Sequence, residues 1–168
     1  MTDGYAACQR LAHASHAGCW AHVRRKFHDA LQVQKSQRTG KAQVGFNFIQ
    51  RLFVLERQWA NLSTAQRLEQ RQLTAQPLID DLSQWLEKSL PLITPKFQLG
   101  RAMIYLPKQW GKLTVFLQSG NVPIHNNQAE NKIRPFVIGP KNWVFNDSVK
   151  GAESSAAIYS LIETAKAN

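Results

Sequence analysis

Apolar residues recur at helical spacing from Gly18 to about residue 118. Steps of three and four residues place them on one face of an α-helix. In the first segment this face consists of Trp20, Val23, Phe27, Ala30 and Leu31. The opposite side of the same segment is basic and holds Arg24, Arg25, Lys26 and His28. The pattern predicts an amphipathic helix that begins just after Gly18.

Two further helical segments follow. The first has an apolar side that leads toward Trp59 and consists of Phe46, Ile49, Leu52 and Phe53. The second begins after Ser63 and Thr64, which are typical N-cap residues, and continues as far as Leu90. Pro77 lies inside it, and we expect this proline to kink the helix or split it in two.

A last helical segment of this region covers residues 97–118, with an interruption expected at Pro107. The pattern changes after it. Short extended runs are predicted at 136–139 and 143–145, and a final helix is predicted around residues 156–165. The sequence therefore predicts a mainly α fold with a few short strands.

The charge of the chain points to a polyanionic partner. There are 21 Lys and Arg residues against 11 Asp and Glu residues, which gives a net charge of +10 and an isoelectric point near 10.0. A domain this basic usually binds a polyanion, and DNA is the commonest one. The alternative is that the charge serves solubility alone. Composition does not distinguish DNA from RNA or from an anionic lipid.

The sequence contains no segment that is typical of secretion or of membrane insertion. No apolar run reaches the roughly 20 residues that span a bilayer, and the first residues have neither a basic head nor an apolar stretch typical of a secretion signal. Cys8 and Cys19 are too few for a disulfide framework. We therefore expect a cytoplasmic protein with no membrane partner.

Glu130 and Asp3 are candidates for chemistry on phosphates. The basic neighbours of Glu130 in the sequence are Lys132, Arg134 and Lys141. A basic surrounding stabilises a carboxylate, and carboxylates hold the Mg²⁺ ions that assist phosphodiester cleavage. The local alternative for Glu130 is a capping box with Asn127 as N-cap. The local sequence around Asp3 predicts a turn close to the N-terminus, where the chain is expected to fray.

Soft metal ligands cluster near the start of the chain. They are Cys8, His13, His16, Cys19 and His22. Their spacing matches no standard zinc finger. Cys19 and His22 lie one helical turn apart, so they have the spacing to share a metal, whereas a packed cysteine and a polar-facing histidine are the alternative.

Two further groups of side chains have a DNA-binding and a structural interpretation. The densest basic run consists of Arg24, Arg25 and Lys26. It either contacts phosphates or forms an ordinary solvated helix face. Trp143, beside Lys141 and Asn142, either stacks on a base or packs in a core.

Four stretches carry a resemblance to a known family. They are residues 3–5 (DGY), 18–27 (GCWAHVRRKF), 126–143 (NNQAENKIRPFVIGPKNW) and 158–166 (IYSLIETAK). In this order, and over essentially the whole chain, the sequence strongly resembles transposases of the insertion sequence sixty-six family. It corresponds to the C-terminal portion of their catalytic region.

The resemblance implies a ribonuclease-H-like domain with an Asp-Asp-Glu triad that binds two Mg²⁺ ions. Asp3 matches the second Asp and Glu130 matches the Glu, both as catalytic residues and metal ligands. The first Asp belongs to an upstream strand that is absent here. We therefore expect an incomplete domain in three regions: a remnant of the sheet edge at 1–17, an α-helical insertion at 18–118, and the C-terminal catalytic part at 119–168.

The implied activity is Mg²⁺-dependent DNA cleavage and strand transfer at transposon ends. The expected DNA-binding residues are Arg24, Arg25, Lys26, Lys132, Arg134, Lys141, Asn142 and Trp143. We expect the isolated chain to bind DNA without catalysis, because two carboxylates do not hold two metals in register without the third. A second copy or a full-length transposase is a further candidate partner.

Three positions depart from the family pattern. His125 stands where Asp is usual, and Asn131 and Pro140 stand where Arg is usual. The two missing arginines should weaken phosphate contacts, which favours a decayed remnant or a fragment. The alternatives are a non-enzymatic DNA-binding or regulatory module that interferes with the full-length transposase, and a zinc-stabilised interaction domain built on Cys8, Cys19 and His22.

Overall fold

The structure is a computed structural model that describes residues 16–33, 40–127, 131 and 148–167. Within these residues the regular structure is helical and includes no strand, so the mainly α prediction is confirmed for them. The predicted strands and the remnant at 1–17 lie outside the described residues apart from 16 and 17. The chain divides into two compact units, Met1–His125 and Asn126–Asn168.

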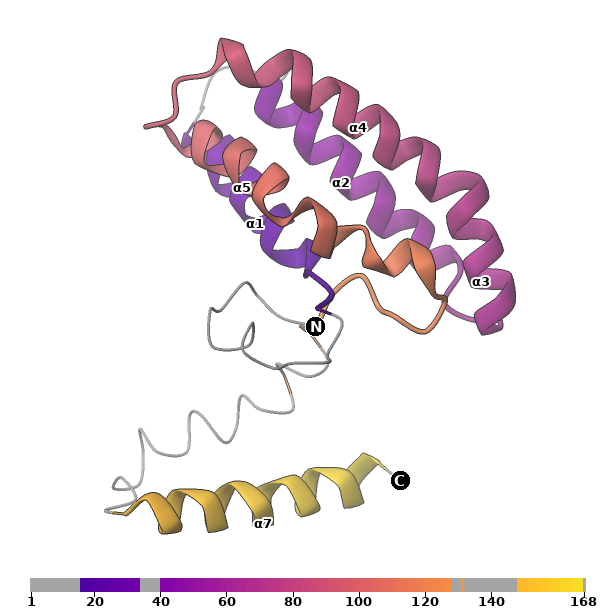
Figure 1. Cartoon of the computed structure of the whole chain (residues 1–168), viewed down its shortest axis with the longest axis vertical. Helices are drawn as coiled ribbons and strands as arrows, with labels where there is room; N and C mark the ends of the chain where they lie inside the picture. Colours follow the sequence, from indigo (N-terminus) through magenta and orange to yellow (C-terminus); the bar gives the residue numbers. More distant parts are fainter. Residues whose placement is uncertain (1–15, 34–39, 128–130, 132–147, 168) are drawn as a thin grey trace. The chain divides into compact units, whose positions relative to one another are not determined.

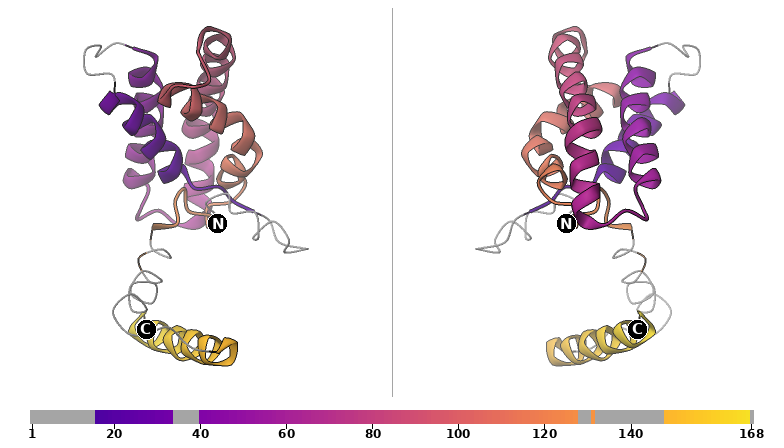
Figure 2. Two further views of the ribbon diagram at one scale, coloured as in Figure 1. Left: turned by 90° about the vertical axis from the view of Figure 1, so that its left-hand side faces the viewer. Right: turned by 90° about the vertical axis from the view of Figure 1, so that its right-hand side faces the viewer.

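The first unit is a bundle of helices (Figures 1 and 2). Its elements are α1 (Trp20–Val33), α2 (Lys41–Gln58), α3 (Thr64–Gln70), the π-helical segment η2 (Arg71–Ala75), α4 (Gln76–Ser89), the short η3 (Leu90–Leu92), α5 (Gln98–Leu113) and η4 (Val115–Gln118). α1 packs against both α2 and α5, and α2 packs against α4 as well. The chain therefore returns beside its first helix when it forms α5.

The core of this unit comes from the apolar faces that the periodicity predicts. On α1 the buried residues are Trp20, Val23, Phe27 and Ala30. Other large and fully buried side chains come from the remaining helices and include Ile49, Leu52, Leu82, Met103, Leu106, Leu113 and Phe116. Burial of each such side chain contributes roughly 1.5–3 kcal/mol, so this shared core holds the helices together.

Gly45 lets α1 and α2 approach closely. A Cβ atom at this position would overlap the Phe27 ring and would lie 2.9 Å from the Trp85 ring. Only a hydrogen fits there, so the glycine is required by packing rather than by backbone conformation.

Ser63 caps α3 as the sequence predicts. Its side chain accepts a hydrogen bond from the Gln66 amide at 3.3 Å, and the Ser63 amide donates to the Gln66 side chain at 3.1 Å. This reciprocal pair is a capping box. It satisfies amides at the helix start that have no partner within the helix.

The two internal prolines behave differently from each other. Around Pro77 the α-helix is interrupted as predicted, and the interruption is the π-helical segment η2 that lies between α3 and α4 along one continuous helical path (Figure 1). The predicted interruption at Pro107 is wrong, because α5 continues through this residue. Pro107 is exposed, so its ring does not collide with a neighbouring helix. The missing backbone hydrogen bond and the crowding of the Met103 carbonyl remain as a local cost within α5.

In the second unit, the described helix is α7 (Val149–Ala167), which confirms the predicted final helix. Several of its large apolar side chains are exposed, namely Val149, Ile158, Leu161 and Ile162. Near its end, Glu163 accepts a hydrogen bond from Lys166 at 2.9 Å, and this contact raises the pKa of the lysine. None of the described helices is long and apolar enough to cross a membrane.

Candidate functional site

The beginning and the end of the helical unit are joined by hydrogen bonds. The Gly18 amide donates to the Lys112 carbonyl at 2.8 Å, and the Trp20 amide donates to the Ile124 carbonyl at 2.9 Å. The Trp20 indole N–H donates to the Leu113 carbonyl at 2.9 Å. The first amides of a helix have no hydrogen-bond acceptor within the helix. The Ile124 carbonyl therefore accepts the hydrogen bond of an amide, that of Trp20, which has no acceptor within α1. The chain thus enters and leaves the unit at one place.

A buried arginine holds the segment that follows α5. The Arg71 side chain is 1% exposed, and its guanidinium donates to the carbonyls of Phe116, Ser119 and Val122. Glu56 balances its charge, and each carboxylate oxygen lies 2.7 Å from a guanidinium nitrogen. A buried charge is costly unless it is paired and hydrogen-bonded. Arg71 meets both conditions by binding this segment.

Two neighbouring residues add to this arrangement. Arg67 donates to the Gly120 carbonyl at 3.3 Å, and the Thr64 hydroxyl donates to the Asn121 side chain at 2.8 Å. Any side chain at Gly120 would overlap the Thr64 carbonyl. We call residues 114–124, held by these contacts and by Arg71, the clamped segment.

The clamped segment leads directly in sequence to the predicted catalytic glutamate. Ile124 is its last residue, and Glu130 follows six residues later. Asn127 and Asn131, on either side of the glutamate in the sequence, are helical. Residues 128–130 lie outside the described residues, so the choice between capping box and metal ligand at Glu130 stays open.

Arg24 is directed toward α2. Its Nε donates to the Gln50 side chain at 2.9 Å, and its guanidinium carbon lies 5.6 Å from the ring centres of Phe46 and of Phe53. This arrangement gives Arg24 a packing role between α1 and α2. Its predicted role in DNA binding stays a prediction.

Lys26 and Arg25 lie on other sides of α1. The Lys26 ammonium lies 4.7 Å from the ring centre of Tyr105 on α5. Arg25 is exposed. The basic run that is continuous in the sequence is therefore divided in space, with Arg24 facing α2 and Lys26 facing α5.

His125, one of the three departures from the family pattern, packs against α2. Its ring stacks on Phe53 with a centroid distance of 5.8 Å and an interplanar angle of 4°. An aspartate has no ring for this contact, so the change from Asp replaces a charge with packing. The His125 Nδ1 atom is buried and has no hydrogen-bond partner among the described residues.

The other predicted site residues lie outside the described residues. They are Asp3, Glu130, Lys132, Arg134, Lys141, Asn142 and Trp143. Their roles stay predictions. Across the described part of the chain, no group of three or more His, Cys, Asp or Glu side chains is arranged to hold a metal ion.

The zinc alternative receives little support from its described members. Cys19 is a free thiol, 2% exposed, within the core, as expected for a packed cysteine. His22 keeps a buried Nδ1 atom with no hydrogen-bond partner among the described residues. Cys8 and His13 lie outside the described residues.

Arg71 is the residue that the sequence analysis missed. It shares a helical face with buried residues at the following steps of three and four, Ala75, Leu78 and Leu82. A charged residue at a core-facing position is the signal that identifies it. Its partner Glu56 is not apparent from spacing, because the two residues lie on different helices.

Comparison with known proteins decides the family. The sequence profile described as Transposase IS66 family matches residues 1–154. The chain belongs to this family. Membership supports a transposase-related function, and it confirms the resemblance seen in the sequence motifs.

Relatives of this IS66-family chain occur in Sinorhizobium fredii strain NGR234. The uncharacterized protein y4hP is 34% identical over 161 residues, which cover 90% of this chain and 29% of the relative. The uncharacterized protein y4qI is 32% identical over 178 residues, which cover 100% of this chain and 32% of the relative. The chain thus spans about a third of the length of these relatives. No solved structure matches it.

Proposed function

We propose that this chain is the part of an IS66-family transposase that supplies two catalytic carboxylates, Asp3 and Glu130, for Mg²⁺-dependent DNA cleavage and strand transfer. The observation that supports this most directly is the junction of Gly18 and Trp20 with Lys112 and Ile124. At this junction the end of the long helical stretch lies beside its beginning. The helical stretch that separates Asp3 from Glu130 in the sequence thus begins and ends at one place.

The same junction agrees with the proposed division of the chain. A segment whose two ends are adjacent can be inserted between neighbouring elements of another domain without separating them. We infer that the helical region predicted at 18–118, together with the clamped segment that packs on it, forms such an insertion. Residues 1–17 and the residues after the clamped segment would then belong to a ribonuclease-H-like catalytic domain.

The donor set suits magnesium. Mg²⁺ prefers carboxylate oxygens, so Asp3 and Glu130 would hold it together with a third carboxylate from the upstream part of the catalytic region. The bound ion would supply Lewis acidity at the phosphodiester. The lysines and arginines near Glu130, which are Lys132, Arg134 and Lys141, would neutralise neighbouring phosphates.

Transposition of a marked element in cells tests this proposal. The complete transposase reading frame is compared with its Asp3→Asn and Glu130→Gln variants, because each change keeps the side-chain shape and removes a charged metal ligand. We expect both variants to fall to the background of cells without transposase. Glu153→Gln, which neutralises an exposed acid on α7, is the matched control and should transpose normally.

Normal transposition by the Glu130→Gln variant at equal protein abundance would contradict the catalytic role. A second experiment separates the regulatory alternative, in which the 168-residue chain is expressed together with the full transposase. Inhibition that is equal for the chain and for its Glu130→Gln variant, combined with full activity of that variant in the transposase itself, would identify a non-enzymatic regulator.

A further inference from the structure

One face of α5 is basic along most of its length. The side chains that share it follow each other at steps of four, three and four, and they are Arg101, Tyr105, Lys108 and Lys112. At 3.6 residues per turn, these steps keep all four on one side of the helix. The buried residues of α5 include Ala102, Met103, Leu106 and Leu113 and lie on the other side.

Helix α1 extends this face. Lys26 lies over the Tyr105 ring at 4.7 Å, and α1 and α5 pack side by side. We call Lys26 together with Arg101, Tyr105, Lys108 and Lys112 the α5 basic face. A tyrosine at its centre supports the Lys26 ammonium by a cation–π contact and leaves the charge at the surface.

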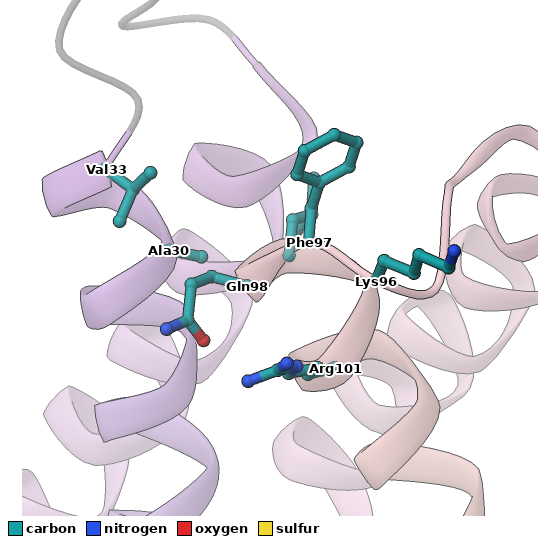
Figure 3. A pocket seen from close by; sticks show the side chains of 7 residues that line it. Ala30, Val33, Lys96, Phe97, Gln98 and Arg101 are labelled. Carbon is teal, nitrogen blue, oxygen red and sulfur yellow. The ribbon is translucent and has the colours of Figure 1, made fainter.

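A cleft lies beside Arg101 at the beginning of α5. There Lys96, Phe97 and Arg101 line a cleft of about 310 Å³, with Ala30 and Val33 at the end of α1 on its other side (Figure 3). Lys96 is exposed, and Phe97 is 70% exposed. The Lys96 side chain extends away from Arg101 (Figure 3), so Lys96 is not counted in the face.

Acidic residues are kept away from this face. α5 contains no Asp or Glu, and α1 contains a single one, Asp29, which lies 3.8 Å from His28. In the described part of the first unit, the other acids are on α2, α3 and α4 and are Glu56, Glu69, Asp80, Asp81 and Glu87. Glu56 is already paired with Arg71. Among the described residues, the cations of the α5 basic face form no salt bridge.

We propose that the α5 basic face binds the phosphate backbone of double-stranded DNA. The partner rests on the proposed function, whereas the surface rests on this charge distribution. From Arg101 to Lys112 the helix rises about 17 Å at 1.5 Å per residue, the axial length of about five base pairs at 3.4 Å each. Lysines act as point charges on phosphates, so the face positions the DNA and does not read its sequence.

A membrane surface is a less suitable partner. A helix that lies on a bilayer buries its apolar face among the lipids. The apolar face of α5 is already buried in the protein core through residues such as Met103 and Leu106, both 0% exposed. Between Arg101 and Lys112, α5 therefore offers a partner charge rather than an apolar face, as expected for a contact with phosphates.

Binding of a fluorescein-labelled random-sequence duplex to the 168-residue chain tests the proposal. The variant is Arg101→Gln/Lys108→Gln/Lys112→Gln. The control is Arg51→Gln/Arg57→Gln/Lys88→Gln, which removes the same charge from exposed positions of α2 and α4. Fluorescence anisotropy is measured between about 50 and 200 mM salt, and circular dichroism checks that both variants keep the helical content of the unchanged chain.

We expect the α5 variant to bind at least about tenfold more weakly than the control. Its slope of log K against log salt should fall by about 2.7, because each neutralised phosphate contributes about 0.9. Equal affinities and slopes for the two variants would overturn the proposal. So would an α5 effect confined to duplex RNA, or to vesicles of equal parts phosphatidylcholine and phosphatidylserine.

The two proposals fail separately. Normal DNA binding by the α5 variant, with transposition still blocked by Glu130→Gln, overturns the α5 basic face alone. If the α5 variant binds DNA more weakly and Glu130→Gln leaves transposition unaffected, DNA binding by the α5 basic face is supported and the catalytic role of Glu130 is overturned.

Discussion

At the scale of single residues, Arg71 has the largest structural role among the charged side chains described. Its guanidinium joins three parts of the unit, namely Glu56 on α2, its own π-helical segment, and the carbonyls of Phe116 to Val122 in the clamped segment. A buried ion pair is weak evidence for net stability, but removal of one partner leaves the other buried and unpaired. The carbonyls would lose their donor at the same time.

Arg71→Ala should lower the free energy of unfolding by about 3–5 kcal/mol, the range for a broken buried ion pair. Urea denaturation followed by circular dichroism measures the change. Arg57→Ala, an exposed arginine on α2, is the control and should stay within about 0.5 kcal/mol. A loss below about 1 kcal/mol for Arg71→Ala would show that the unit relaxes around the vacant site.

At the scale of elements, the hydrophobic pattern identifies the helices and their buried faces. The predictions of the buried face of α1 and of an N-cap at Ser63 are confirmed, because both depend on residues close together in the sequence. The prediction fails at Pro107, where α5 continues through the proline. The π-helical form of the interruption before Pro77 was not foreseen either, since local propensity does not encode the tertiary contacts of Arg71.

The same limit applies to the candidate site. The motifs indicate Asp3, Glu130 and the basic run on α1 through family resemblance. The division of that run between α2 and α5 follows from how the helices pack. The α5 basic face is present in the sequence as a spacing of four, three and four, yet its meaning depends on which side of α5 the core occupies.

Two glycines in helices should respond oppositely to alanine. Gly45→Ala places a methyl group against Phe27 and Trp85, and overpacking of this kind costs about 1–3 kcal/mol. Gly111→Ala meets nothing within 4 Å, so the better helix propensity of alanine should stabilise the protein by about 0.5–1 kcal/mol. Thermal and urea unfolding measure both changes. Stabilisation by Gly45→Ala would contradict the close approach of α1 and α2.

Ser63→Ala should cost about 1 kcal/mol, because it removes the side-chain half of the capping box. Ser63→Asp keeps an acceptor for the Gln66 amide and should restore most of the loss. Urea midpoints of the two variants, compared at equal slope, give the difference. Equal destabilisation by Ala and Asp would mean that the hydroxyl acts through something other than the cap.

At the scale of the whole molecule, the feature with the widest effect is the junction of the first and last segments of the helical unit. Gly18 and Trp20 bind carbonyls more than ninety positions later in the chain. The clamped segment is fixed at the same place by Arg67 and Arg71 from another part of the bundle. The junction is therefore held from two sides.

Trp20→Phe should loosen this junction. The Leu113 carbonyl loses its buried donor, and an unsatisfied buried group costs about 1–3 kcal/mol. Hydrogen exchange followed by NMR should show faster exchange of the Gly18 amide, whose acceptor is Lys112. Trp110→Phe, at a half-buried position of α5, is the comparison and should leave Gly18 unchanged. Unaltered exchange at Gly18 in Trp20→Phe would show that the junction does not depend on the indole.

A helical unit whose first and last residues lie side by side imposes few geometric constraints on the segments that flank it in the sequence. A connector of a few residues could replace it in the sequence, because the entropy cost of closing a loop rises only slowly with the length of the loop. Such a body can be lost, lengthened or transplanted between proteins in a single genetic event. Its amino-acid sequence can then change under the constraints of its own core alone, separately from Asp3 and Glu130, the proposed catalytic residues on either side of it in the sequence.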